Sequence, residues 1–515
     1  MEITTTLVGD LREILRSALW LWPEVVWVVA IIVILLTDLI LRRKSGSLFI
    51  MLLVFAVAVN GFFLVQQWNL LTVDETLPRF LDTLRLDRLA IYLKGLFGLA
   101  LLFVGLMSFR TRSGSTRVGF ERLDQVGEYY IMMLGVVLGA SLMVSTTHLL
   151  TIYLAIELVS LSSYLLANFN FDRKSAEASL KYVLYGSAAS GLMLYGMSLL
   201  YGLTGTLLLT DPAFSQGLSD APKLISSLAI GFTLVGFLFK ISAVPFHIWA
   251  PDIYEGVPTP IAAFFSVVPK IAGIGLLLRI TPVLFSATPE FPGEWVLGMV
   301  AMMTMIAGNV AALHQTNAQR MLAYSSIAHS GFLLVGLLVA SRWGTYSVLF
   351  YATVYLFMNL AAFWLVQLLG KYTGARYIPD YRGLGLRFPV LGVATLTVMV
   401  ALTGLPPTAG FTAKLFIFSS LWDYYQQSQE PQLLYVLVVG LFNTVIALFY
   451  YLKIPYYLFF KKAPDNLETS VVTLSRNSSQ ILGTFGMFLL IIPLLVLFFK
   501  SDWLMAIISQ IIRVL

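Results

Sequence analysis

The chain has 515 residues, of which 58% are hydrophobic and 12% are charged, and its formal net charge is +6. Soluble domains carry about 25% charged residues, so this composition indicates a polytopic membrane protein and argues against a soluble enzyme or a nucleic-acid-binding protein. The chain contains no cysteine, which excludes disulfides, thiolate-bound zinc and cysteine-ligated iron–sulfur clusters on this polypeptide.

Fourteen segments are long and apolar enough to cross a membrane, which requires about 20 residues each. In chain order they are 18–41, 47–67, 88–109, 128–146, 149–168, 176–202, 223–247, 258–281, 294–313, 321–341, 346–370, 389–421, 432–457 and 480–499. The predicted fold is therefore an all-α polytopic membrane protein with about 14 transmembrane helices. The residues after Lys500 are expected to form a short interfacial helix.

Two of these segments contain signals for a broken helix. Pro245 interrupts the seventh segment, and Pro406 and Pro407 interrupt the twelfth, which is too long for one straight span. Proline lacks a backbone donor and clashes with the preceding turn. Helices 7 and 12 are therefore expected to be broken.

The order of helices suggests an internal duplication. We expect an N-terminal unit of helices 1–3 (1–127), a first repeat of helices 4–8 (128–281), a second repeat of helices 9–13 (294–457), and helix 14 with a short tail (458–515). Each repeat would contain a broken, lysine-bearing helix. An offset of five helices would invert the second repeat relative to the first, a plan typical of transporters with a site near the membrane midplane.

Basic residues in alternate loops predict the orientation. Seventeen Lys and Arg residues lie in the loops of one side and ten in those of the other. The basic-rich side is expected to face the cytoplasm or its equivalent, with both termini on the far side.

Five charged residues lie inside the apolar segments: Glu157, Lys181, Lys240, Lys270 and Lys414. A charge near the bilayer centre costs on the order of 2.5–3.5 kcal/mol, so such residues usually serve a function. Burial disfavours the charged form of a group, and a nearby opposite charge restores it, so a carboxylate–lysine pair can act as a switchable proton carrier. The alternatives are that Lys181 reaches the interface from near its helix end and that Glu157 is only a structural partner.

Two histidines are candidates for a proton relay. His329 lies within segment ten, and His247 follows Pro245 at the expected helix break. The alternative for each is a hydrogen-bonded polar residue without a role in transport. No pair of histidines is spaced convincingly for haem, and we expect no metal site.

Three sequences carry a family resemblance: FKISAVPFHIWAPDIYEGVPTPIAAFFSVVPKIAG, NAQRMLAYSSIAHSGFLLVG and LTGLPPTAGFTAKLFIF. They resemble the antiporter-like membrane subunits of respiratory complex I, most of all subunit 2, and within it the cyanobacterial and plastid type of the photosynthetic NDH-1 complex. The resemblance covers nearly the whole chain. It implies a proton path in which Glu157 and Lys240 form a switching pair, followed by Lys270 and Lys414, with Lys181 as a further lysine.

The resemblance also implies the protein's context. The complex would couple electron transfer from ferredoxin or NAD(P)H to plastoquinone with proton pumping in a cellular thylakoid membrane, with both termini in the lumen. A plasma membrane and a plastid thylakoid membrane are the alternative locations. Flavin, iron–sulfur clusters and quinone would be bound by other chains. The partners would be antiporter-like paralogues, small membrane subunits and lipid. A stand-alone cation/proton antiporter and a non-pumping spacer of the membrane arm are the alternative functions.

Overall fold

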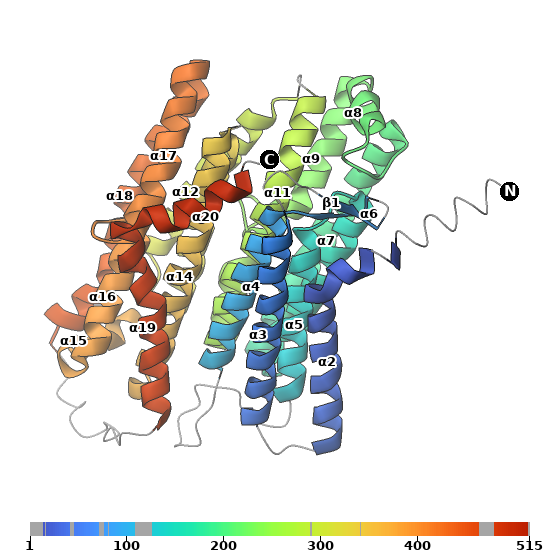
Figure 1. Cartoon of the computed structure of the whole chain (residues 1–515). Helices are drawn as coiled ribbons and strands as arrows, with labels where there is room; N and C mark the ends of the chain where they lie inside the picture. Colours follow the sequence, from blue (N-terminus) through green and yellow to red (C-terminus); the bar gives the residue numbers. More distant parts are fainter. Residues whose placement is uncertain are drawn as a thin grey trace.

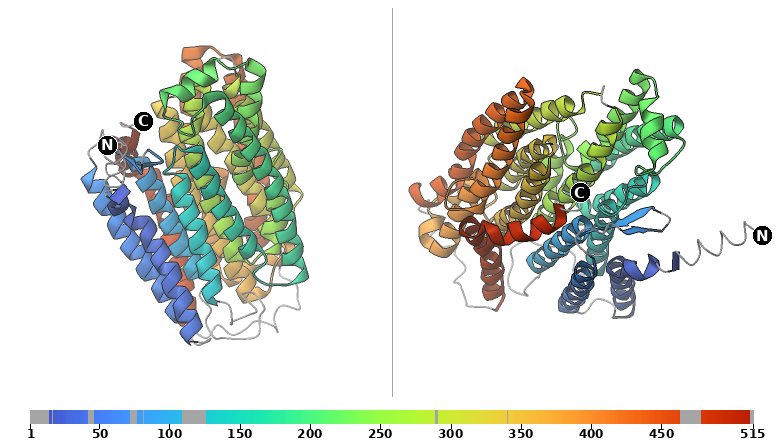
Figure 2. Two further views of the ribbon diagram at one scale, coloured as in Figure 1. Left: turned by 90° about the vertical axis from the view of Figure 1, so that its right-hand side faces the viewer. Right: turned by 45° about the horizontal axis from the view of Figure 1, so that its top comes forward.

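The computed structural model describes residues 14–15, 17–41, 46–71, 77–80, 82–108, 126–288, 291–339, 341–462 and 478–512. Most of these residues belong to helices that run side by side, as the views in Figures 1 and 2 show. Both ends of the chain and many basic loop residues behind the orientation prediction lie outside the described residues. The orientation of the chain therefore stays a prediction.

The N-terminal part contains three long helices and a small hairpin. Its elements are η1 (Leu19–Leu21), α2 (Trp22–Leu41), α3 (Gly46–Leu70), β1 (Leu77–Arg79), β2 (Leu84–Leu86) and α4 (Arg88–Met107). The antiparallel hairpin, which pairs Leu77 with Leu86, is an addition to the predicted helical fold. Asp87 ends the hairpin and caps α4, since its carboxylate accepts a 2.8 Å hydrogen bond from the Ala90 amide.

The central part contains the first predicted broken helix. Its elements are α5 (Val126–Met143), α6 (Leu149–Ala167), α7 (Arg173–Thr204), α8 (Pro212–Ser219), α9 (Lys223–Lys240), α10 (Trp249–Gly256) and α11 (Thr259–Ala287). The helix breaks between α9 and α10, and Pro245 lies within the break, as predicted. Helix α11 continues to Ala287 instead of ending near residue 281, so Arg279 lies more than two turns before its end.

The C-terminal part contains the second predicted break. Its elements are α12 (Gly293–Leu313), α13 (Ala318–Leu338), α14 (Arg342–Thr373), η3 (Ile378–Tyr381), α15 (Leu384–Arg387), α16 (Pro389–Thr403), α17 (Ala409–Ser428), α18 (Pro431–Phe460), α19 (Ser478–Phe499) and α20 (Ser501–Ile512). Residues 404–408 separate α16 from α17 and include Pro406 and Pro407. Gly404 begins the break with a φ of 83°, a conformation that glycine adopts without strain.

Twelve helices in the described part of the chain are each long and apolar enough to cross a membrane. The two other predicted spans correspond to the broken pair α16–α17 and to α19, so every predicted segment contains helix. Helix α20 turns by 87° from α19 and lies across the bundle in Figure 1. It forms the short C-terminal helix that the sequence predicted.

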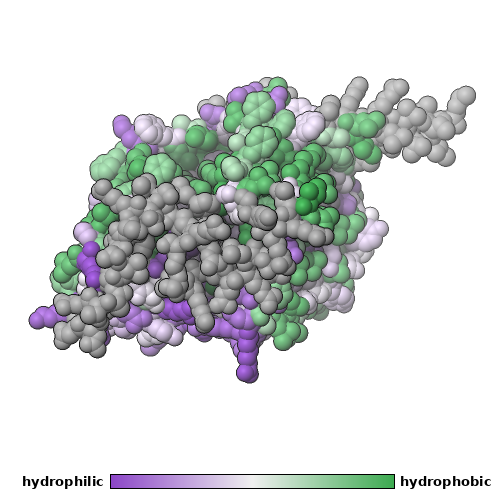
Figure 3. All heavy atoms as spheres, turned by 90° about the horizontal axis from the view of Figure 1, so that it is seen from below, coloured by the Kyte–Doolittle hydropathy of each residue, from purple (hydrophilic) through white to green (hydrophobic). Residues whose placement is uncertain are grey.

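Helix α11 lies at the centre of the bundle, and its most apolar stretch is completely buried. It packs against α4, α5, α9, α13 and α14. By contrast, most of α2 and α3 is exposed on the outside of the bundle. Seen from below in Figure 3, apolar residues cover much of the visible rim, and polar residues gather along the lower edge of the view. The buried charges described next lie on and around the central helices.

Candidate functional site

Lys240 is the last residue of α9, directly before the helix break, and only 1% of its surface is exposed. Its Nζ donates a 2.7 Å hydrogen bond to Ser160 Oγ on α6. This position suits a cation because the C-terminal end of a helix carries partial negative charge. The helix break thus places the Lys240 ammonium at the face of α6.

Glu157 lies three residues before Ser160 on α6, so the two side chains are neighbours on the helix surface. Glu157 is half-buried, and its Oε1 is buried without a hydrogen-bond partner among the described residues. Within the same residues, Glu157 forms no ion pair within 4 Å, and Lys240 contacts Ser160 instead. The structure therefore brings the expected switching pair to one face of α6 without direct contact between the two charges.

Lys270 lies on α11 and is 1% exposed. Its Nζ donates to the carbonyl and the hydroxyl of Ser326, at 2.9 Å each, and to Ser330 Oγ at 3.3 Å. Ser330 Oγ in turn lies 2.7 Å from the Ile241 carbonyl, to which it donates. Because Ile241 follows Lys240, α13 links the two buried lysines through neutral polar groups.

His329 lies between Ser326 and Ser330 on α13 and is 2% exposed. Its Nδ1 lies 2.7 Å from the Tyr351 hydroxyl on α14, and its Nε2 lies 3.0 Å from the Tyr451 hydroxyl on α18. A neutral imidazole has one donor and one acceptor nitrogen, so it can donate to one tyrosine and accept from the other. His329 therefore joins three helices through its two ring nitrogens.

Lys414 lies on α17, just after the second helix break, and is 5% exposed. Its Nζ donates a 2.8 Å hydrogen bond to the carbonyl of Thr403, the last residue of α16. The same ammonium lies 4.6 Å from the centroid of the Phe332 ring, one turn after His329. The break supplies the acceptor, because the last carbonyls of a helix lack intrahelical partners.

Lys181 differs from the other three lysines because its side chain is 41% exposed. It forms 3.0 Å ion pairs with Glu177 on its own helix and with Asp252 on α10. The expectation that Lys181 is a buried charge is therefore corrected. Its helix starts early, at Arg173, and the nearby start of α10 supplies a carboxylate.

The ion pair to Asp252 belongs to a larger network that joins α7, α10 and α13. Arg320 contacts Asp252 at 3.1 Å and Glu255 at 2.7 Å, and Lys174 contacts Glu255 at 2.9 Å. Partial burial of Glu255 opposes ionisation, but the hydrogen bonds from Arg320 and Lys174 prevail and lower the pKa of Glu255 below its usual range. The network thus ties the second half of the first broken helix to α13.

The second candidate relay residue, His247, lies within the first break between Pro245 and the start of α10. It is half-buried, and its Nδ1 is buried without a hydrogen-bond partner among the described residues. The structure does not place it in the row of contacts formed by Lys240, Lys270 and His329.

The sequence analysis did not predict two buried ion pairs. Lys94 on α4 lies 2.6 Å from Glu24 on α2, and both side chains are about 95% buried. Arg279 forms two hydrogen bonds, of 2.7 and 2.6 Å, with Asp87. Glu24 and Lys94 both lie in predicted spans, so the criterion that identified Lys240 would also have found them.

Comparison with known proteins adds a family assignment to this geometry. Residues 146–447 match the family model described as "NADH:quinone oxidoreductase/Mrp antiporter, TM". The chain is 38% identical to NADH-quinone oxidoreductase subunit N from Anaeromyxobacter sp. (strain Fw109-5), with 93% of this chain and 94% of that protein covered. It is 37% identical to the chloroplastic NAD(P)H-quinone oxidoreductase subunit 2 of Mesostigma viride, with 86% and 85% covered.

A solved structure agrees with these relatives. A chain of respiratory complex I from Thermus thermophilus, solved with bound aureothin, superposes with a TM-score of 0.73 at 28% sequence identity. The match covers 94% of this chain and 98% of that one.

Proposed function

Since the chain belongs to the family of NADH-quinone oxidoreductase subunit N and NAD(P)H-quinone oxidoreductase subunit 2, we propose that its buried lysines carry protons for a redox-driven pump. The chain is an antiporter-like membrane subunit of a proton-pumping quinone oxidoreductase. The electrons move on other chains, where we place any flavin, iron–sulfur clusters and the quinone.

One observation carries the proposal: Lys240, Lys270 and Lys414 are at most 5% exposed and have no carboxylate within 4 Å among the described residues. Each ammonium donates its hydrogen bonds to neutral oxygens, and Lys414 also lies over the Phe332 ring. Burial without a counter-charge makes the charged form costly. A small change in the local field can therefore shift a proton onto or away from each lysine.

The contacts suggest an order for the path. Glu157 and Lys240 lie at one face of α6 without direct contact. Ser330 and Lys270 continue the path along α13, and His329 leads toward Lys414. In this proposal the movement of Lys240 between Ser160 and Glu157 is the switch, because contact with the carboxylate would favour the charged lysine. Lys414 exchanges protons with the far side of the membrane.

Lys181 has a different role in this proposal. Its partners Asp252 and Glu177 hold its partly exposed ammonium between α7 and α10, where it can respond to a neighbouring subunit. It would transmit an electrostatic signal between subunits without carrying the proton itself.

We also propose that the complex is of the photosynthetic type, in a thylakoid membrane with both termini in the lumen. Its donor would be ferredoxin or NAD(P)H, and its acceptor plastoquinone. The three sequence motifs that carry the family resemblance and the similarity to the chloroplastic subunit 2 of Mesostigma viride support this assignment. Electron transfer from reduced ferredoxin to a plastoquinone analogue in isolated thylakoid and plasma membranes tests it, and activity only in plasma membranes with NADH contradicts it.

The experiment that tests the pumping role compares Lys270→Ala with wild type in membranes. We expect the complex to assemble and proton uptake per electron to fall. Unchanged uptake would support the spacer alternative. Purified chain in liposomes that exchanges cations for protons without a redox partner would support the antiporter alternative.

A further inference from the structure

We propose that a cavity at the junction of α13 and α14 binds one anionic membrane lipid. The cavity has a volume of about 700 Å³ and lies between the last turns of α11 and α13 and the first turns of α12 and α14. This volume is typical of ligand sites, which span about 300–1,000 Å³. None of the buried lysines of the proposed proton path lines it.

The charge of the cavity favours an anion. Its lining includes the three guanidinium groups of Arg85, Arg279 and Arg342 and a single carboxylate, that of Glu294. Arg279 is occupied, because both of its terminal nitrogens bind Asp87. The remaining two arginines are the candidate anion ligands.

Both remaining arginines can bind a headgroup. Arg342 is exposed and forms no ion pair or hydrogen bond with the described residues. Among the described residues, the carboxylate paired with Arg85 is that of Asp87, whose Oδ2 lies 3.9 Å from the Arg85 Nε. Glu294 is occupied by the Tyr424 hydroxyl, which donates to it at 3.1 Å. A guanidinium fork binds phosphate with two parallel hydrogen bonds, so Arg85 and Arg342 suit a phosphate headgroup.

The remainder of the wall suits an acyl chain. Phe285, Leu297 and Leu337 line the cavity together with further aliphatic residues, and Thr345 adds a hydroxyl near Arg342. A soluble phosphate ester would use the arginines and leave this apolar wall uncovered. A lipid would use both parts of the wall, with its headgroup at the arginines and its acyl chain on the apolar residues.

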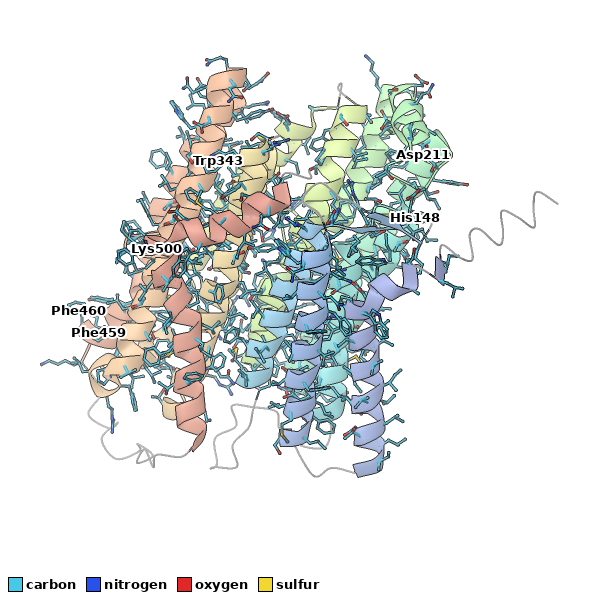
Figure 4. All side chains as sticks on the ribbon, viewed as in Figure 1. His148, Asp211, Trp343, Phe459, Phe460 and Lys500 are labelled. Atoms are coloured by element: carbon cyan, nitrogen blue, oxygen red, sulfur yellow. The ribbon has the colours of Figure 1, made fainter. Side chains whose placement is uncertain are left out.

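The position of the cavity also fits a headgroup. Arg342 and the neighbouring Trp343 begin α14, and Trp343 stacks on Tyr346 with ring centroids 5.2 Å apart. Figure 4 shows Trp343 in the upper part of the bundle. Tryptophan and tyrosine are enriched at the membrane–water interface, where lipid headgroups lie.

The test uses the assembled complex in phosphatidylcholine vesicles that contain phosphatidylglycerol with a diazirine in its acyl chain. After illumination we expect label on peptides from residues 278–297 and 336–345. Arg342→Gln should lower this labelling about tenfold, as expected for loss of a charge-assisted hydrogen bond. Adding Arg85→Gln to Arg342→Gln should lower the labelling further. Arg342→Lys, in place of Arg342→Gln, should restore part of the labelling.

Arg173→Gln is the matched control, because Arg173 is also the exposed first residue of a 32-residue helix, α7, and lies away from the cavity. Unlabelled phosphatidylglycerol should compete with the probe, and phosphatidylcholine and glycerol phosphate should not. Labelling that survives Arg342→Gln, or equal labelling by a phosphatidylcholine probe, would overturn the proposal. Competition by glycerol phosphate at matched ionic strength would also overturn it, since the site would then take a soluble anion.

Discussion

The Lys240 ammonium donates a 2.7 Å hydrogen bond to the Ser160 hydroxyl, three residues after Glu157 on the same helix. This arrangement gives Lys240 two alternative partners on one face of α6, a neutral hydroxyl and a carboxylate. Transport by the proposed switch depends on the exchange between them.

Ser160→Ala removes the neutral partner of Lys240. A buried donor left without an acceptor costs about 1–3 kcal/mol, so we expect the variant to be less stable. We also expect the Lys240 ammonium to spend more time in contact with the Glu157 carboxylate. Proton uptake per electron should fall while the complex still assembles on native gels. Ser163→Ala is the control, because the Ser163 hydroxyl donates to the Val159 carbonyl of its own helix, and Lys240 donates to Ser160 instead. Equal effects of both substitutions would contradict a specific role for Ser160.

Tyr451→Phe tests the contacts of His329. The Tyr451 hydroxyl meets His329 Nε2 and Ser325, so its loss leaves one ring nitrogen without a partner. We expect slower coupled turnover and a loss of stability of about 1 kcal/mol. Tyr129→Phe is a matched control, since Tyr129 is equally buried and its hydroxyl meets Ser108 instead, away from His329. A turnover that falls equally in both variants would show that only packing is involved.

Glu255 gives a pH prediction. Its pKa is lowered in the folded chain by the hydrogen bonds of Arg320 and Lys174, despite the opposing effect of its partial burial. A lowered folded pKa means that the contribution to stability is fully present above the unfolded value, about 4.3, and is lost as the pH falls through the folded value. Thermal unfolding of wild type and Glu255→Gln should therefore differ at neutral pH and converge in acid. A difference that grows below pH 4 would contradict the assignment.

The buried ion pair of Glu24 and Lys94 is predicted to stabilise the complex and to have no role in proton transport. Removing one member of a buried ion pair costs about 3–5 kcal/mol, because the other charge is left without its partner. Glu24→Gln should therefore reduce assembly strongly, and Glu24→Gln combined with Lys94→Met should recover it. Proton uptake per electron in the double variant should equal that of wild type. A recovered complex that fails to pump would place this pair in the transport path.

The sequence could predict features that depend on local chemistry. Long apolar runs located the spans, and the missing amide of Pro245 located the first break. Lys240 and Lys270 could be predicted as buried because they lie deep in their runs. The second partner of Lys181 could not be predicted, since Asp252 is 71 residues away and contacts it only through the packing of α10 on α7.

Tertiary packing also explains the other gaps in the prediction. The two tyrosines that flank His329 come from helices 22 and 122 residues away along the chain. Arg279 lies inside the predicted span 258–281, but its pairing could not be predicted, because Asp87 and the Val144 carbonyl that bind its guanidinium come from other segments of the bundle. Burial combined with a distant counter-charge cannot be predicted from one segment alone.

The most direct test of the central claim is proton uptake per electron in membranes that carry Lys240→Ala, with assembly of the complex checked on native gels. The account predicts an assembled complex in which uptake per electron, or coupled quinone reduction, falls sharply. Normal assembly, electron transfer and proton stoichiometry would contradict it and assign the buried lysines a purely structural role.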